Sequence, residues 1–103
     1  MDVIYLHRGL RFVWNSEKAR SNREKHEVTF EEACEVFFDP VYMLADAMAA
    51  DEERHAAIGI TTKRRLLVVV HMLIQGNLVR IISARGATLK ERREYEDNGR
   101  AHS

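Results

Sequence analysis

The spacing of apolar and polar residues predicts a strand followed by a helix near the start of the chain. Residues 11–14, in the order Arg-Phe-Val-Trp, favour a short strand. The very polar segment 17–26 is typical of a surface helix, and either Asn15 or Ser16 can cap its first turn. We assign no element to residues 1–10 and expect them to be poorly ordered.

A second helix is predicted to begin after Thr29. Thr29 and Glu32 have the spacing of a capping box, in which Thr29 caps the helix and Glu32 reaches back to the cap. The helix ends at Asp39-Pro40, because proline cannot continue the hydrogen-bond ladder. Apolar residues recur inside this segment at helical spacing, at Ala33, Val36 and Phe37.

From residue 41 onward the pattern changes to that of β-strands. Short turn-forming segments separate the apolar runs, and the pair Gly76-Asn77 reaches positive φ angles at little cost. Successive strands joined by such short turns pair antiparallel. We therefore predict a four-stranded antiparallel meander with strands over 41–44, 54–61, 66–73 and 78–84.

The meander passes directly into a last helix. Thr88 and Glu91 form a second capping box, which predicts a polar helix over 89–98 with Gly99 just beyond its end. We expect residues 99–103 to be poorly ordered. The order strand, two helices, four strands, helix is an α+β pattern, and 103 residues suffice for a single domain over 1–103.

Composition indicates a soluble cytoplasmic protein. Hydrophobic residues make up 46% of the chain, but the longest strongly apolar stretch, 66–74, has about half the length that a membrane span needs. The first residues lack the basic and apolar regions of a secretion signal. The single cysteine, Cys34, cannot form an internal disulfide, which agrees with a reducing compartment.

Charge is divided unevenly along a chain whose formal net charge is zero. Residues 1–62 carry a net charge of −5 and residues 63–103 a net charge of +5. A basic half suits nucleic acid, because phosphate binding depends on local potential more than on total charge. Scattered, solvated charges would give the same count, so charge alone leaves both interpretations open.

The segment from Arg80 to Glu91 places fixed cations beside a hydroxyl group. A regular strand puts Arg80 and Ser83 on opposite faces, with Arg85 at the strand exit. The planar guanidinium group of arginine grips phosphate and stays charged at neutral pH. The basic turn 63–65 adds three cations, although solvated turn residues are an equally ordinary explanation for it.

Two segments offer groups for proton transfer. Glu53 and Arg54 precede His55 at the start of a strand that would lie beside Arg80 if the pairing order permits. Lys25-His26 ends the first helix, where a histidine can also serve only as a favourable cation near the helix C-terminus. A rim ion pair or ordinary packing would equally account for the first segment.

The remaining reactive residues suggest neither a metal site nor a covalent nucleophile. The histidines show no paired spacing with one another or with Cys34, so we predict no metal and no cofactor. Ser83 lacks the surrounding glycines of a hydrolase elbow. Tyr95, on the polar last helix, is placed to face a bound base or a partner, or else to pack against the fold.

Taken together, these residues resemble the BrnT family, the toxins of bacterial type II toxin-antitoxin pairs. The resemblance runs from Phe12 to Glu96, and the order and spacing of its pieces are more specific than any piece alone. The pieces are Phe12-Val13-Trp14-Asn15, Lys18-Ala19, Asn22, Lys25-His26, Val28, Phe30-Glu31-Glu32-Ala33, Val36-Phe37, Asp39-Pro40, Glu53-Arg54, Ile58-Gly59, Leu67-Val68-Val69, Arg80-Ile81-Ile82-Ser83-Ala84-Arg85, Ala87, Glu91-Arg92 and Tyr95.

The resemblance implies a RelE-like fold and a ribonuclease that inhibits translation without a metal or cofactor. Cleavage would proceed by attack of the ribose 2′-hydroxyl on the adjacent phosphate. A BrnA-like antitoxin, commonly in a two-plus-two assembly, would neutralise the toxin and supply the DNA-binding part. A degenerate toxin that only binds its antitoxin and modulates operator binding is the main alternative, and a separate RNA-binding domain is a third.

The resemblance also implies roles for individual residues. It assigns Arg80 and Arg85 to the phosphate, Glu53 and Arg54 to orientation or proton handling, and Lys25 or His26 to acid-base catalysis. We expect further RNA contacts from Lys63, Arg64, Arg65, Ser83 and Tyr95.

Three positions depart from the usual pattern of similar sequences. Glu27 replaces a glycine, which costs free energy if the helix ends in a left-handed conformation. His55 replaces a tyrosine, and Gly86 replaces a basic residue.

Overall fold

The structure, a computed structural model, describes residues 1–46 and 53–101 as an α+β fold. The strands are β1 (Asp2–His7), β2 (Leu10–Asn15), β3 (Met43–Asp46), β4 (Arg54–Ile60), β5 (Leu66–Ile74) and β6 (Leu78–Gly86). The helices are α1 (Ser16–His26), α2 (Phe30–Cys34), the 3₁₀ helix η1 (Glu35–Phe38) and α3 (Leu89–Ala101). Asn15 is the residue that caps α1, accepting hydrogen bonds from the Glu17 and Lys18 amides at 3.0 Å.

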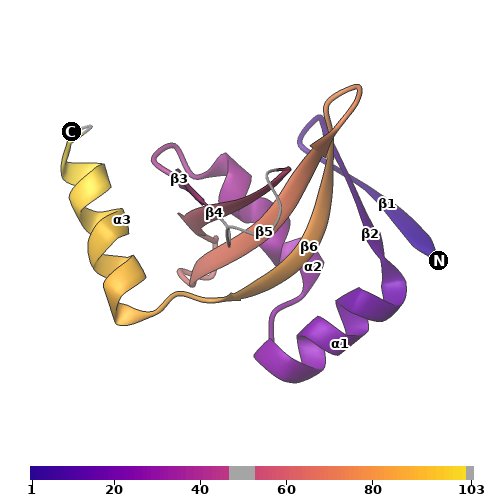
Figure 1. Cartoon of the computed structure of the whole chain (residues 1–103), viewed down its shortest axis with the longest axis horizontal. Helices are drawn as coiled ribbons and strands as arrows, with labels where there is room; N and C mark the ends of the chain where they lie inside the picture. The colour runs from indigo at the N-terminus through magenta and orange to yellow at the C-terminus, as the bar shows by residue number, and fades with distance from the viewer. Residues whose placement is uncertain (47–52, 102–103) are drawn as a thin grey trace.

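The strands form one mixed sheet in the order β1-β2-β6-β5-β4-β3 (Figure 1). The predicted meander is present as β3 to β6, but the expectation of a four-stranded sheet was wrong, because β2 pairs parallel with β6 and β1 extends the sheet further. Residues 2–7 alternate between exposed and half-buried positions, and Val3 and Tyr5 pack against the core. The sequence does not show this alternation, because the exposed positions include the apolar residues Ile4 and Leu6.

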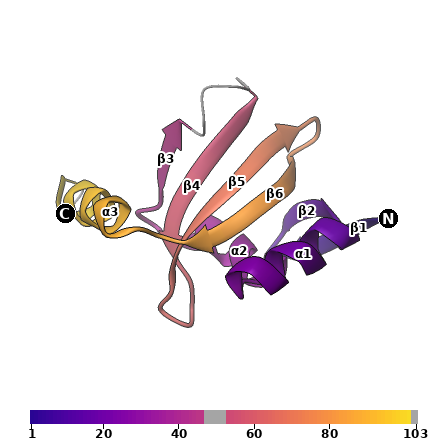
Figure 2. The same ribbon diagram turned by 60° about the horizontal axis from the view of Figure 1, so that its bottom comes forward.

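The main core lies between the sheet and the segment formed by α2 and η1 (Figure 2). Phe12 and Trp14 of β2 meet Phe30 and Val36 from the helical layer, and all four are at most 3% exposed. Trp14 and Phe30 pack edge to face, with ring centroids 5.8 Å apart. Burial of these large apolar groups fixes the helical layer on one face of the sheet.

The second helix differs from its prediction in two respects. The Thr29 hydroxyl caps α2 by accepting a hydrogen bond from the Glu32 amide at 3.1 Å, as expected. The Glu32 carboxylate does not complete the capping box, because it accepts hydrogen bonds from Thr61 and Arg65 instead. The helix also tightens into the 3₁₀ helix η1 after five residues, before Asp39.

α3 covers part of the opposite face of the sheet and lies on the far side of the molecule from α1 (Figures 1 and 2). Tyr95 packs against a second apolar cluster built from Ala56, Ile58 and Val68 with Leu66. Gly99 was predicted to follow the helix, but α3 continues to Ala101. None of the described helices is long and apolar enough to cross a membrane.

α1 ends at a residue in the left-handed conformation, which costs free energy at this position because the residue is not glycine. Glu27, its C-terminal cap, has φ 56° and ψ 34°, and its amide donates to the Arg23 carbonyl at 2.9 Å. A side chain with a Cβ atom is strained in this region, which glycine enters freely.

We predict that Glu27→Gly stabilises the protein by about 1 kcal/mol, because the substitution relieves the left-handed strain. The matched control is Glu24→Gly, an exposed position inside α1, which should destabilise the protein by about 1 kcal/mol. Urea unfolding of both variants measures the two changes. Equal signs for the two substitutions would contradict the assignment of strain to residue 27.

Candidate active site between α1 and β6

A hollow of about 200 Å³ lies between α1 and β6. Lys25 and His26 line it from the helix, and Ser83 lines it from the strand, so the structure brings together candidates that lie far apart in sequence. The remaining lining residues are Lys18, Ser21, Asn22 and Ile82. The five α1 residues follow the repeat i, i+3, i+4, i+7, i+8, which places them on one face of the helix. We call this space the α1–β6 hollow.

Asn22 joins the two walls of the α1–β6 hollow. Its side chain is 6% exposed, and its Nδ2 donates hydrogen bonds to the carbonyls of Ala84 at 2.9 Å and Val28 at 3.1 Å. Its Oδ1 accepts a hydrogen bond from the Ala84 amide at 3.0 Å. The side-chain amide thus satisfies both backbone groups of Ala84 on an edge of β6 where none of the described strands pairs with it.

Arg65 holds the C-terminal end of α1 from the other side. One terminal nitrogen donates to the Glu27 carbonyl at 3.0 Å, and the other donates to the Glu32 carboxylate at 3.0 Å. The guanidinium group of Arg65, which was predicted to contact RNA, fixes the end of the helix that carries Lys25 and His26. Lys63 and Arg64 remain exposed at the tip of the β4–β5 turn.

A β-bulge changes which face of the sheet Ser83 occupies. The β5–β6 register shifts between Val70 and His71, and the extra residue on β6 is Ile82. Beyond the bulge Ser83 pairs with Val70, while Arg80 pairs with Met72. Because Val70 and Met72 share a face of β5, Arg80 and Ser83 lie on the same face, and the expectation of opposite faces was wrong.

Arg85 lies on that face too, since it pairs with Val68. Arg80, Ser83 and Arg85 therefore form a row along β6, which we call the β6 row. Its ends are aligned with β5 residues four positions apart and are therefore about 13 Å apart, given the rise per residue of a strand.

Both arginines of the β6 row already hold a carboxylate. Arg80 donates to Asp2 at 3.0 Å, and hydrogen bonding from Arg80 lowers the pKa of that carboxyl. Arg85 grips Glu91 with two hydrogen bonds, of 2.8 and 2.9 Å. These bonds lower the pKa of Glu91 to about 2, and the Thr88 amide and hydroxyl bonds of the confirmed capping box add to the effect.

The segment with Glu53 and Arg54 does not lie beside β6, because β5 runs between them. Arg54 is aligned with Met72, which in turn is aligned with Arg80, so the two arginines share a face about 10 Å apart. His55 is aligned with His71, whose ring packs edge to face against Phe37 of the core face. The structure thus separates Arg54 from His55 by the thickness of the sheet.

Tyr95 faces the protein, which agrees with the packing alternative. Its hydroxyl donates a hydrogen bond to the Asp39 carboxylate, and burial together with Asp39 raises the pKa of the phenol. Asp39 also accepts from the amides of Val41 at 2.9 Å and Ile60 at 2.8 Å. The tyrosine therefore anchors α3 to the chain around residue 39.

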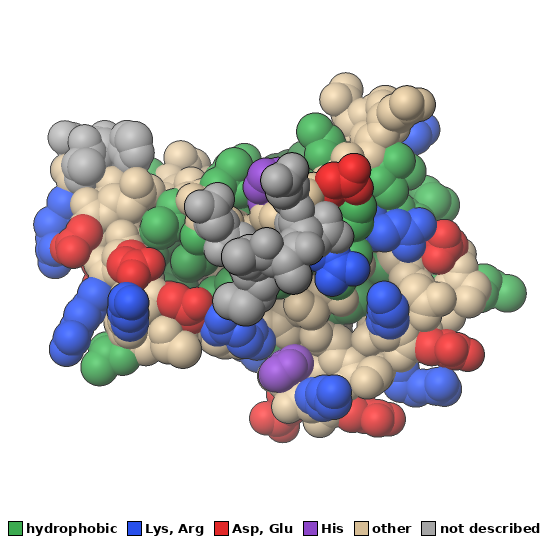
Figure 3. Space-filling model, in the orientation of Figure 1, with side chains coloured by type: hydrophobic (Ala, Val, Ile, Leu, Met, Phe, Trp, Pro, Cys, Tyr) green, Lys and Arg blue, Asp and Glu red, His purple; other side chains and the backbone are tan. Residues whose placement is uncertain are grey.

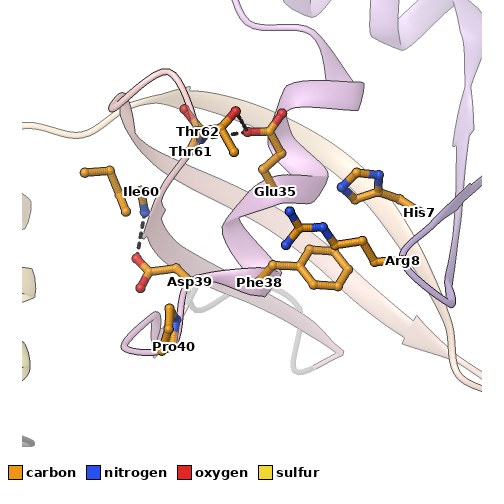
Figure 4. Close-up of a pocket in the computed structure, with 9 residues that line it drawn as sticks. All are labelled: His7, Arg8, Glu35, Phe38, Asp39, Pro40, Ile60, Thr61 and Thr62. Atoms are coloured by element: carbon orange, nitrogen blue, oxygen red, sulfur yellow. Dashed lines mark hydrogen bonds between the residues drawn. The ribbon is translucent and has the colours of Figure 1, made fainter.

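A second hollow, of about 390 Å³, contains none of the predicted site residues (Figure 4). The guanidinium group of Arg8 lies over the Phe38 ring at 5.3 Å. Glu35 accepts hydrogen bonds from the amide and hydroxyl of Thr62 at 2.8 and 2.7 Å. The two carboxylates that line this hollow, those of Glu35 and Asp39, therefore stabilise the β4–β5 turn and η1.

The charge division along the sequence does not produce separate basic and acidic surfaces on the face drawn in Figure 3. Basic and acidic side chains are interspersed there. Burial raises the pKa of the Cys34 thiol, which leaves it a poor nucleophile. No three His, Cys, Asp or Glu side chains gather as metal ligands within residues 1–46 and 53–101. On the face drawn in Figure 3, cations are therefore placed singly among acidic groups and do not form a broad basic surface.

Lys18, Ser21 and Asn22 also line the site, although they were not among the predicted site residues. Their spacing from Lys25 and His26, visible in the sequence, places all five on one helix face. This pattern was obscured because the helix is polar on nearly every side, so no apolar stripe marked the face that turns toward β6.

We predict that Glu91→Gln flattens the acid limb of the stability profile. A carboxyl whose pKa falls from 4.5 to about 2 on folding stabilises the protein above pH 4.5, and this stabilisation is lost as pH falls toward 2. The expected loss is about 1 kcal/mol, because Arg85 is partly exposed and the pair is screened. Urea unfolding across this range measures it, and exposed Glu94→Gln is the control. An unchanged acid limb in Glu91→Gln would contradict the assigned ion pair.

Comparison with known proteins identifies the family. Residues 14–91 match the model of a family described as the ribonuclease toxin, BrnT, of type II toxin-antitoxin systems. A search of curated proteins found no match. The 1.1 Å crystal structure of the Brucella abortus ribonuclease toxin BrnT has a similar fold, with a TM-score of 0.60 and 23% sequence identity over 73% of this chain and 92% of that one. Because the family match spans most of the chain, this protein belongs to the BrnT family of type II toxin-antitoxin systems.

Proposed function

We propose that this protein is an endoribonuclease toxin that cleaves RNA in the α1–β6 hollow and thereby inhibits translation. The observation that carries the proposal is the placement of Lys25 and His26 against Ser83 in that hollow. An ammonium group, an imidazole and a hydroxyl are groups that can move protons and hold a phosphate. Membership of a ribonuclease toxin family supports the same activity.

The proposed reaction needs only groups that the chain supplies. A base, His26 or Lys25 in its neutral form, removes the proton from the ribose 2′-hydroxyl, and the 2′-oxygen attacks the adjacent phosphorus. The bond from phosphorus to the 5′-oxygen breaks, and an acid protonates the leaving oxygen. The products are a 2′,3′-cyclic phosphate and a 5′-hydroxyl. Cations beside the phosphate stabilise the charge that grows on its oxygens.

The β6 row would supply those cations. Arg80 lies 30% exposed on the same face as Ser83, and Arg85 marks the other end of the row. An incoming phosphate would replace the Asp2 and Glu91 carboxylates that now hold these groups. Exposed ion pairs contribute little net free energy, so such an exchange is feasible. We assign Glu53 and Arg54 to more distant RNA contacts, with Lys63 and Arg64.

A type II toxin has a protein antitoxin as its partner. We propose a BrnA-like antitoxin, in a two-plus-two assembly that contacts DNA through the antitoxin alone. We expect the antitoxin to inhibit the toxin at the β6 row, because the arginines of this row can exchange one carboxylate partner for another. An acidic antitoxin segment would then compete with RNA for the same cations.

We predict that the purified protein cuts RNA to leave 5′-hydroxyl ends and that substitutions in the α1–β6 hollow abolish cutting. His26→Ala and Lys25→Ala should lower the rate about 10²-fold or more, the usual effect of removing an acid or base. Polynucleotide kinase labels the new ends without prior phosphatase treatment. Lys90→Ala, an exposed cation of α3 outside the hollow, is the control. Intact RNA with retained antitoxin binding would favour the degenerate binding module.

We further predict opposite effects from the two members of the Asp2–Arg80 pair. Arg80→Ala should raise KM for RNA, because a phosphate ligand is lost, whereas Asp2→Asn should lower KM by removing the carboxylate that competes with phosphate. Steady-state kinetics at two salt concentrations measures both changes and should show weaker effects at high salt. A rise in KM for both variants would contradict phosphate binding at Arg80 and indicate a structural ion pair.

A further inference from the structure

Asn22 is the buried residue of the otherwise polar helix α1. It makes three hydrogen bonds, and two of them go to the amide and carbonyl of a single residue, Ala84. This pairing imitates what a neighbouring strand would provide at that edge of β6. The surface helix α1 is thus attached to the sheet by a side chain that hydrogen-bonds to the backbone of a strand.

The edge is open because β2 stops pairing with β6 early. The parallel ladder ends where Val13 meets Arg80, after which β2 turns into α1. β6 continues as far as Gly86, paired on its other side with β5. The bulge at Ile82 lies in this one-sided stretch, between the last contact with β2 and the contact with Asn22.

The position of Asn22 relates it directly to the proposed chemistry. Lys25 and His26 follow it by three and four residues and line the same hollow, and Ser83 precedes Ala84. The third hydrogen bond joins Asn22 to the Val28 carbonyl, just beyond the end of α1. Lys25 and His26 lie within the segment that this bond closes. The three bonds therefore fix both walls of the hollow within one helical turn of the acid-base pair.

We infer that Asn22 is a positioning residue for RNA cleavage, which sets the placement of Lys25 and His26 relative to Ser83. The inference rests on the proposed function. It gives Asn22 no contact with substrate, since its polar atoms are already used by Ala84 and Val28. Loss of such a support lowers the rate of the chemical step more than the binding of RNA.

The first test is Asn22→Ala. We expect kcat to fall about 10²-fold while KM changes less than about threefold, because misplacement of catalytic groups by about 1 Å has an effect of this size. The matched control is Asn98→Ala on α3, which also removes an amide bonded to a distant carbonyl, that of Val41. Both variants are assayed well below their unfolding temperatures, with the folded fraction measured by circular dichroism.

The second test, Asn22→Asp, keeps the shape of the side chain and makes its donor depend on pH. A protonated carboxyl can donate to the Ala84 carbonyl and accept from the Ala84 amide, whereas a carboxylate has no donor. Burial raises the pKa of the introduced carboxyl. The ratio of variant to parent kcat should therefore rise about tenfold between about pH 8 and about pH 5. The ratio is needed because the other ionisable side chains that line the hollow, Lys18, Lys25 and His26, are present in both proteins.

Nuclear magnetic resonance separates this inference from the proposed function. In Asn22→Asp, the resonances of His26, Ser83 and Ala84 should shift together with pH, while those of the α3 region remain as in the parent. Equal kcat in parent and Asn22→Ala, or a kcat ratio that does not change with pH, would overturn the inference while the ribonuclease function stands. If the parent leaves RNA intact, the proposed function fails, and unmoved His26 and Ser83 resonances would then overturn the inference independently.

Discussion

The arrangement of the site depends on one unfilled strand edge. Backbone amide and carbonyl groups that leave water must find partners, and β6 loses its β2 neighbour after Arg80. Asn22 supplies both partners for Ala84, which lets a polar helix pack where a strand would otherwise be required. α1 gains little from apolar burial, so its position is specified by the hydrogen bonds of Asn22 to Ala84 and of Arg65 to the Glu27 carbonyl. Side chains that face β6 are consequently held by a small number of polar contacts.

The bulge at Ile82 determines which side chains share a face of β6. A regular β6 would place Ser83 and Arg85 together on the face opposite Arg80. One extra residue brings both of them to the face of Arg80, while Ile81 and Ala84 stay buried in the core. Each arginine carries an internal carboxylate, in keeping with a chain of zero net charge. In the proposed function, RNA would therefore compete with the protein's own acidic groups for these arginines rather than be attracted to a basic surface.

Local signals in the sequence predicted most of the helices and strands. The pairings between residues far apart in sequence could not be predicted from it. The caps at Thr29 and Thr88 and the turn at Gly76-Asn77 act within a few residues, so their chemistry is visible in sequence. The β2–β6 ladder and the bonds of Asn22 to Ala84 join residues more than sixty positions apart, and the bulge depends on the register between β5 and β6. For the same reason the sequence predicted a local capping-box bond for the Glu32 carboxylate. In the fold this carboxylate bonds instead to Thr61 and Arg65, which are distant in sequence.

The three departures from the usual BrnT pattern lie outside the α1–β6 hollow, and the fold shows why they can be tolerated. His55 faces the core side of the sheet near His71, away from Arg54 and the β6 row. Gly86 is exposed at the end of β6, and its carbonyl still accepts a hydrogen bond from Arg85. Glu27 adjoins the hollow and carries left-handed strain, but the Arg65 bond to its carbonyl holds the conformation. The groups that would cut RNA, Lys25, His26 and Ser83, therefore keep their surroundings despite all three changes.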